Sequence, residues 1–214
     1  TDRGMTWKQV FSAPAAMAPL LDVLFIDAHH GYAVGAYDAL YESRDSGMTW
    51  QARKLLGDDM HKNAIAKGPG NRLFIAGESG TLYRSDDAGD AWKRLPSPYQ
   101  GSYFGILTLS DNGILIFGLR GKIYRSKDAG MTWSPVLTNS QSSLLGGTAL
   151  RNGRIALVGH DGTVLISKDN GKTFIHHQDK SAKALSSVIL LKHGGLMVFG
   201  EAGLKRLEDE KAIP

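Results

Sequence analysis

Short apolar stretches alternate with polar turns along the whole chain, and each stretch has the length of a β-strand. One representative segment has apolar residues at 107–109 and 114–117, separated by the turn 111–113, which reads Asp-Asn-Gly. An alternating stretch follows at 123–126, and Trp133 begins another. Apolar runs of this length between Gly and Asn turns are typical of strands. The pattern therefore predicts units of four short strands.

An eight-residue motif recurs at a nearly constant spacing. It reads Ser-Arg-Asp-Ser-Gly-Met-Thr-Trp at 43–50 and recurs at 85–92, 126–133 and 167–174, with a clipped copy at 2–7. Its aspartates are 41 to 43 residues apart: Asp2, Asp45, Asp87, Asp128 and Asp169. A glycine recurs before each of the four full copies of the motif and once more near the C-terminus: Gly35, Gly77, Gly118, Gly159 and Gly200. Four strands in each repeat of this length indicate the blade of a β-propeller.

The repeats predict an all-β fold, a single β-propeller domain over residues 1–214 with about five four-stranded blades. The chain begins with one fourth strand and ends with three strands, so pairing of the two ends would complete a blade and remove the exposed edges. The alternative is a fragment of a six- or seven-bladed parent. The expected units are 12–53, 54–95, 96–136, 137–177, and 178–209 combined with 5–11.

The recurring motif, an Asp box, has a mechanical explanation. Its Asp and Ser side chains can accept hydrogen bonds from turn N–H groups, its Gly can adopt positive φ, and its aromatic residue can pack between sheets. A row of carboxylates binding a metal or a sugar is the competing interpretation, but each Asp lies on a separate blade. We interpret the five aspartates as structural, together with the aromatic residues Trp7, Trp50, Trp92, Trp133 and Phe174.

Composition narrows the classes of function. The 214 residues contain no cysteine, which excludes disulfides and thiolate metal sites. The formal net charge of +4 comes from dispersed Lys and Arg without a basic run, so we do not expect nucleic-acid binding. The apolar stretches are far shorter than the ~20 residues of a membrane-spanning helix. The chain opens with Thr1-Asp2-Arg3-Gly4 and not with a basic and then apolar leader, so any export signal was removed or never existed.

The motif G-x-x-G-x-(I/L)-Y-R-S-x-D-A-G-x-T-W is carried by 118–133 and, with Ala91 replacing the threonine, by 77–92. It resembles the photosystem II stability/assembly factor family of BNR/Asp-box propellers, over essentially the whole chain. The resemblance implies an exported, non-enzymatic factor that holds subunits of a membrane complex, and the chain looks like the branch from non-photosynthetic bacteria. It departs from the seven-bladed photosynthetic members in having five units and no matching basic patch.

Sialidases share the Asp box, which makes a glycoside hydrolase or a lectin-like carbohydrate-binding propeller the alternative. Sialidases bind a sugar carboxylate with three arginines and use a Tyr-Glu pair as nucleophile. Their Arg-Ile-Pro motif is missing here, since the nearest string is Arg154-Ile155-Ala156. We therefore do not expect an enzyme.

The candidate binding site is one face of the propeller, formed by the turns between second and third strands and by the segments between blades. We expect these turns to carry equivalent residue pairs at Tyr37-Asp38, Glu78-Ser79, Leu119-Arg120, His160-Asp161 and Glu201-Ala202. The pairs differ between repeats at positions that the scaffold does not constrain, as expected of a ring of binding residues. They are equally well explained as exposed turn residues. The segment 96–104 adds two prolines and three aromatic residues, which suit either a peptide or interblade packing. The candidate residues are Tyr37, Asp38, Glu78, Arg120, His160, Asp161, Glu201, Tyr99, Tyr103 and Phe104.

These observations predict a non-catalytic binding or assembly scaffold without metal or cofactor. Adjacent histidines on a strand point to opposite faces, so His176 and His177 are a poor metal pair. The expected partner is a protein or peptide, such as part of a membrane complex, with carbohydrate as the alternative. From the resemblance we expect export to the periplasm or secretion from a bacterium.

Overall fold

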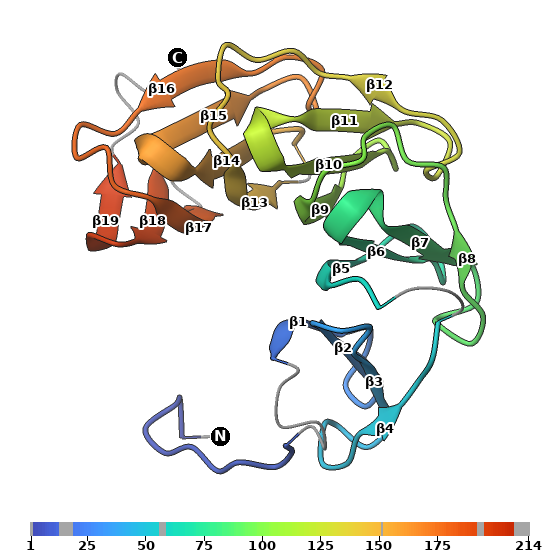
Figure 1. Ribbon diagram of the computed structural model, residues 1–214. Helices are drawn as coiled ribbons and strands as arrows, with labels where there is room; N and C mark the ends of the chain where they lie inside the picture. The colour runs from blue at the N-terminus through green and yellow to red at the C-terminus, as the bar shows by residue number, and fades with distance from the viewer. Residues whose placement is uncertain (1, 13–18, 56–58, 151, 192–194, 208–214) are drawn as a thin grey trace.

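The computed structural model describes residues 2–12, 19–55, 59–150, 152–191 and 195–207. In these residues five antiparallel sheets follow one another in chain order around an arc, and we call them blades 1 to 5 (Figure 1). Blade 1 comprises β1 (Leu20–Phe25), β2 (Gly31–Gly35), β3 (Leu40–Ser43) and β4 (Gln51–Ala52). Blade 2 comprises β5 (Lys62–Lys67), β6 (Leu73–Gly77), β7 (Leu82–Ser85) and β8 (Lys93–Arg94). Blade 3 comprises β9 (Tyr103–Thr108), β10 (Ile114–Gly118), β11 (Ile123–Ser126) and β12 (Ser134–Pro135).

Blade 4 comprises β13 (Leu144–Ala149), β14 (Ile155–Gly159), β15 (Thr163–Ser167) and β16 (Ile175–Gln178). Blade 5 has β17 (Leu185–Leu190), β18 (Leu196–Gly200) and β19 (Gly203–Leu207). Three short 3-10 turns join second and third strands: η1 (Glu78–Gly80), η2 (Leu119–Gly121) and η3 (His160–Gly162). The all-β propeller architecture predicted from the repeats is confirmed.

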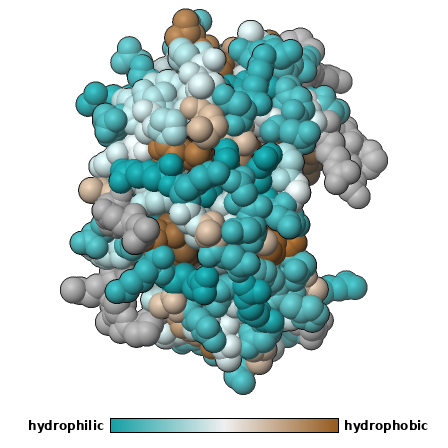
Figure 2. Space-filling view, turned by 90° about the vertical axis from the view of Figure 1, so that its right-hand side faces the viewer, coloured by the Kyte–Doolittle hydropathy of each residue, from teal (hydrophilic) through white to brown (hydrophobic). Residues whose placement is uncertain are grey.

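In the described residues, the four larger hydrophobic cores each lie between two neighbouring blades. The first strands β1, β5, β9, β13 and β17 lie on the inside of the arc, and the short fourth strands lie outside (Figure 1). Between blades 2 and 3, for example, Phe74 and Leu82 pack with Tyr103, Ile106 and Ile116. The outer side near β8 is mostly hydrophilic, with hydrophobic residues in small separate groups (Figure 2). Because every blade depends on its neighbours for burial, stability is distributed along the array.

The glycine at the end of each second strand permits a close approach of two backbones. A Cβ on Gly77 would lie 2.1 Å from the carbonyl oxygen of His61, and one on Gly118 would lie 2.3 Å from that of Ser102. The same contact recurs at Gly35, Gly159 and Gly200. At each site the next residue donates its N–H to that carbonyl, as Glu78 does to His61 at 2.9 Å. The recurrent glycine is therefore required by space at the turn.

The Asp boxes are closed by their own side chains. In blade 3, Ser126 Oγ accepts the N–H of Gly130 at 2.8 Å and donates to Asp128 Oδ1 at 2.8 Å. The same Asp128 carboxylate accepts the N–H of Thr132 at 2.8 Å and its hydroxyl at 2.5 Å. These hydrogen bonds hold the pKa of Asp128 at about 2, with that from the Thr132 hydroxyl the largest cause.

We expect the Asp boxes to make the chain acid-sensitive. Because the folded pKa of Asp128, about 2, lies below its ordinary 3.8, its contribution to stability is present above about pH 4 and is lost as pH falls towards 2. Asp45 behaves in the same way, with a pKa of about 2 caused first by the hydroxyl of Thr49. Thermal unfolding followed by circular dichroism between pH 5 and 2 tests this. In Asp128→Asn the decrease in Tm over this interval should be smaller, and an unchanged pH profile would contradict the assignment.

Side chains of one blade are bonded to the Asp box of the next. Tyr32 donates its hydroxyl to the carbonyl of Ala88 at 2.7 Å, and Arg84 donates to the carbonyl of Ala129 at 2.7 Å. Arg125 does the same to Asn170 at 3.0 Å. The three acceptors occupy the same box position and have φ between 57° and 64°. The left-handed residue of the boxes in blades 2, 3 and 4 thus turns its carbonyl towards the preceding blade.

The expected pairing of the two chain ends stays a prediction. In the part of the chain that the structure describes, β19 pairs with β18 alone, and residues 5–11 form no strand. Trp7, expected to pack between sheets, is 91% exposed, because no blade lies against it. The two ends of the arc stand apart (Figure 1). Blade 1 exposes apolar residues on β1 at its end of the arc: Leu20, Leu21, Val23 and Phe25.

Candidate functional site

The loop face is the side of the arc formed by the turns between second and third strands and by the segments that lead into the first strands. In blades 2 to 4 each turn has two successive residues with positive φ, of which the second is glycine, as in Ser79-Gly80. The predicted alignment of Tyr37-Asp38 with Glu78-Ser79 is wrong by one residue. Tyr37 (φ 52°) matches Ser79, and Asp38 (φ 61°) occupies the position of Gly80.

A buried ion pair joins blades 1 and 2 at this turn. The ammonium of Lys62, the first residue of β5, binds the Asp38 carboxylate, and the Lys62 side chain is fully buried. Burial lowers the pKa of Lys62 to about 8. The N–H of Asp38 also donates to the carbonyl of Met60 at 3.3 Å. Three contacting segments, 36–39, 60–62 and 78–81, therefore meet at the junction of the two blades.

Three of the surrounding side chains form a row on the surface. The ring of Tyr37 meets that of His61 edge to face, with 5.0 Å between centroids. His61 Nδ1 lies 3.7 Å from Glu78 Oε2, and the same oxygen accepts the His61 backbone N–H at 3.3 Å. Tyr37 is 62% exposed, and the His61 and Glu78 side chains are 38% and 41% exposed. The structure thus brings together Tyr37, Asp38 and Glu78 from the predicted set.

The other turn residues of the predicted set are exposed and are spread over three blades: Arg120 on blade 3, His160 and Asp161 on blade 4, and Glu201 on blade 5. Arg120, His160 and Glu201 are each anchored only through the backbone N–H, to Ser143 Oγ, the Ser143 carbonyl and the Ala184 carbonyl respectively. Asp161 accepts the hydroxyl of Ser142 at 2.8 Å. In the described residues, no hydrogen bond or ion pair joins the side chains of these four residues to one another.

The aromatic segment 96–104 packs into the molecule more than the sequence predicted. Tyr103 is fully buried and bonded to Ser97 Oγ at 2.9 Å, so its assignment as a displayed binding residue is corrected. Burial raises its pKa to about 12. Tyr99 stacks on Tyr124 with 6.4 Å between centroids, and Phe104 is half-buried on β9. Interblade packing, the alternative interpretation of this segment, explains why Tyr103 is buried.

Sequence reasoning missed Lys62 as a residue of this face. The repeat alignment contained a signal for it. Lys62 is paired with the recurrent glycine Gly77, and the residues paired with the recurrent glycine in blades 3, 4 and 5 are Tyr103, Leu144 and Leu185. A lysine at an apolar repeat position indicates a buried charge with a partner.

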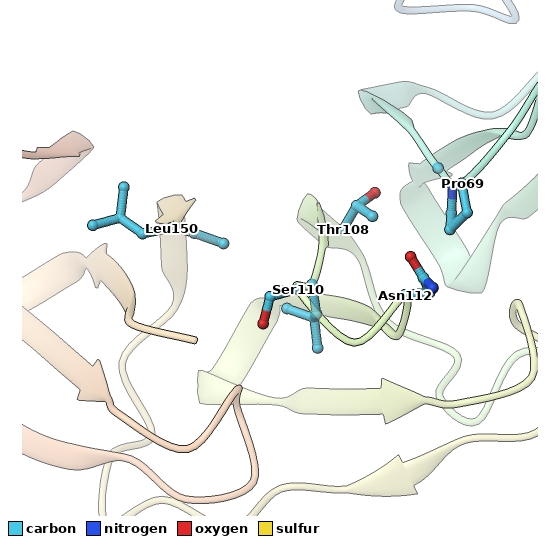
Figure 3. A pocket seen from close by; sticks show the side chains of 8 residues that line it. Pro69, Thr108, Ser110, Asn112 and Leu150 are labelled. Atoms are coloured by element: carbon cyan, nitrogen blue, oxygen red, sulfur yellow. The ribbon is translucent and has the colours of Figure 1, made fainter. Parts of the chain in front are cut away.

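A cavity of about 550 Å³ lies on the opposite side, where no site was predicted (Figure 3). It is formed by the turns between the first and second strands of blades 2, 3 and 4, which contribute Pro69, Ser110, Asn112 and Leu150. None of its described lining residues has an ionisable side chain, so it offers no acid or base for catalysis.

A second cavity, of about 390 Å³, lies beside η2 on the loop face. Arg120 and Lys122 line it together with Tyr124 and Leu137, and Leu137 is 87% exposed. Its lining residues include no acidic side chain, so the cavity favours an anionic and partly apolar ligand.

Among the described residues, no three His, Asp or Glu side chains lie close enough together to hold a metal ion. No described helix has both the length and the apolar character needed to cross a membrane.

A family model described as photosynthesis system II assembly factor YCF48 matches residues 2–154. The chain belongs to this family. A YCF48-family relative, the photosystem II assembly lipoprotein of Synechococcus sp. (strain CC9902), is 39% identical over 77 residues, which is 35% of this chain and 23% of that protein. The matched segment thus spans about a quarter of that relative's length.

Solved structures of the YCF48 family have the same fold. A structure described as YCF48 bound to D1 peptide is 25% identical, with a TM-score of 0.75, and the match covers 91% of this chain and 65% of that one. A virginiamycin B lyase from Staphylococcus aureus, 13% identical, has a TM-score of 0.82 over 95% of this chain and 71% of that one, which shows the fold alone. The predicted family resemblance is confirmed, and the branch within the family stays a prediction.

Proposed function

We propose that this chain is a non-catalytic binding scaffold that presents its loop face to a peptide segment of a protein partner. The observation that carries the proposal is membership of the YCF48 family, one of whose solved structures holds a D1 peptide and shares this fold. The loop face suits the role because its side chains vary from blade to blade on an invariant scaffold.

The partner belongs, on this proposal, to a membrane complex outside the cytoplasm. The Synechococcus relative is an assembly lipoprotein of photosystem II, and a lipoprotein is held at a membrane surface. The proposed location of the chain is the periplasm of a bacterium. None of the relatives described above supports the carbohydrate alternative.

The proposal predicts that this chain binds the D1 peptide of the solved complex and that Arg120 contributes to binding. Arg120→Ala removes an exposed cation beside the cavity at η2. We expect binding to weaken about tenfold, which corresponds to about 1.4 kcal/mol. Fluorescence anisotropy of a labelled peptide measures this. Lys127→Ala is the matched control, because Lys127 is an exposed cation beside an Asp box and away from the loop face; its affinity should stay within about twofold of the unmodified chain.

Two results would contradict the proposal. Equal weakening by both substitutions would show that general charge, and not the loop face, attracts the peptide. Hydrolysis of a model glycoside by the purified chain would show that it is an enzyme.

A further inference from the structure

Two residues at the junction of blades 1 and 2 depart from the repeat, and they are bound to each other. Lys62 occupies a buried position that is apolar in blades 3 to 5. Asp38 has positive φ at a position that is glycine in the other four blades. The Lys62 ammonium binds the Asp38 carboxylate. Each departure therefore has the other as its partner.

This pair is unfavourable for the fold alone. A buried ammonium loses its hydration, and a residue with a side chain is strained at positive φ. The other blades form the same turn with an apolar residue and a glycine, so the scaffold does not need the pair. Departures from local rules of this kind are expected at functional sites. Instead, the ion pair holds the turn that carries Tyr37 and Asp38 against blade 2.

The junction fixed in this way displays two aromatic rings and one carboxylate in a row. His61 lies between Tyr37 and Glu78, with contacts of 5.0 Å to the Tyr37 ring centroid and 3.7 Å to Glu78 Oε2. Within the residues described, Glu78 Oε1 has no hydrogen-bond partner. The charge of Asp38 is neutralised by Lys62, so the uncompensated negative charge in the row belongs to Glu78.

We propose that Tyr37, His61 and Glu78 form a recognition site for an arginine side chain of the partner segment. A guanidinium is planar, stacks on aromatic rings and donates to a carboxylate oxygen in a fixed geometry. The exposed Tyr37 ring supplies the stacking surface, and Glu78 Oε1 supplies the acceptor. This inference rests on the proposed function, because it names a side chain that the bound segment carries.

The test uses the whole chain and a small probe, so that it does not depend on finding the partner. The ¹⁵N-labelled protein is titrated with N-acetyl-arginine methylamide, and backbone shifts are followed by NMR. The matched control probe is the citrulline analogue, which has nearly the same shape without the charge. We expect saturable shifts at Tyr37, His61 and Glu78 with the arginine probe and at least fivefold smaller shifts with the citrulline probe. Equal shifts with both probes, or none with either, would overturn the proposal.

Variants separate recognition from folding. Tyr37→Ala and Glu78→Gln change exposed side chains and should each weaken the arginine probe at least tenfold. Asp90→Asn, which changes an exposed carboxylate in the Asp box of blade 2 and away from the loop face, should leave it unchanged. The double variant Lys62→Leu with Asp38→Gly restores the repeat pattern, so it should fold and yet lose the site-specific shifts. Retained shifts in that folded variant would refute the positioning role. Loss of D1-peptide binding with probe binding intact would count against the proposed function alone.

Discussion

Replacing Gly89 by alanine is expected to destabilise the chain by roughly 3–5 kcal/mol. Gly89 lies in the Asp box of blade 2 with φ at +101°, and a Cβ there would lie 2.1 Å from the hydroxyl oxygen of Tyr32. Tyr32 is fully buried and is bonded to the Ala88 carbonyl and to Glu42, so it cannot move aside without losing both bonds. The substitution therefore disrupts the interface between blades 1 and 2.

Urea unfolding followed by tryptophan fluorescence measures the effect. Gly70→Ala is the matched control, because Gly70 also has positive φ, +65°, but a Cβ there would have no atom within 4 Å. The control should lose only about 1 kcal/mol, the cost of the backbone conformation. Equal losses for the two variants would show that the Tyr32 contact is not what constrains Gly89.

Asp38→Asn is expected to destabilise the chain by about 2–3 kcal/mol at pH 7, because it leaves the Lys62 ammonium buried without its counter-ion. The burial that lowers the pKa of Lys62 to about 8 limits this loss, since the amine can release its proton. An amine whose pKa is lower in the folded state than in the unfolded state destabilises the fold while it is charged. This destabilisation decreases as pH rises through the folded-state pKa. The loss in Asp38→Asn should therefore shrink between pH 7 and pH 9.

The control is Asp161→Asn, at the position of blade 4 that also has positive φ and that lies exposed beside Ser142. Its one exposed hydrogen bond contributes little, so a loss of at most about 0.5 kcal/mol is expected at every pH. Urea midpoints at pH 7 and pH 9 give the comparison. A loss in Asp38→Asn that is the same at both pH values would show that Lys62 does not release its proton between pH 7 and pH 9 in the folded chain.

The Asp boxes could be assigned from the sequence because their chemistry is local. Ser126, Asp128 and Thr132 lie within seven consecutive positions, and their hydrogen bonds close one turn. The candidate site was predictable only in part. The turns that carry Tyr37 and Glu78 were found, but their alignment was wrong by one residue because the non-glycine Asp38 takes the position of a glycine. Tyr103 was assigned to the surface because segment 96–104 resembles a displayed loop, and packing against blade 2 buries it.

Periodicity and turn chemistry are properties of neighbouring residues, and they were sufficient to establish the strands, the blades and the recurrent glycines. Contacts between blades join residues far apart in the chain, such as Asp38 with Lys62 and Arg84 with Ala129, and no local rule encodes them. The row of Tyr37, His61 and Glu78 exists only because three segments from two blades meet at one junction. Burial, the lowered pKa of Lys62 and the exposure of Tyr37 follow from that packing, since each depends on which blade lies alongside.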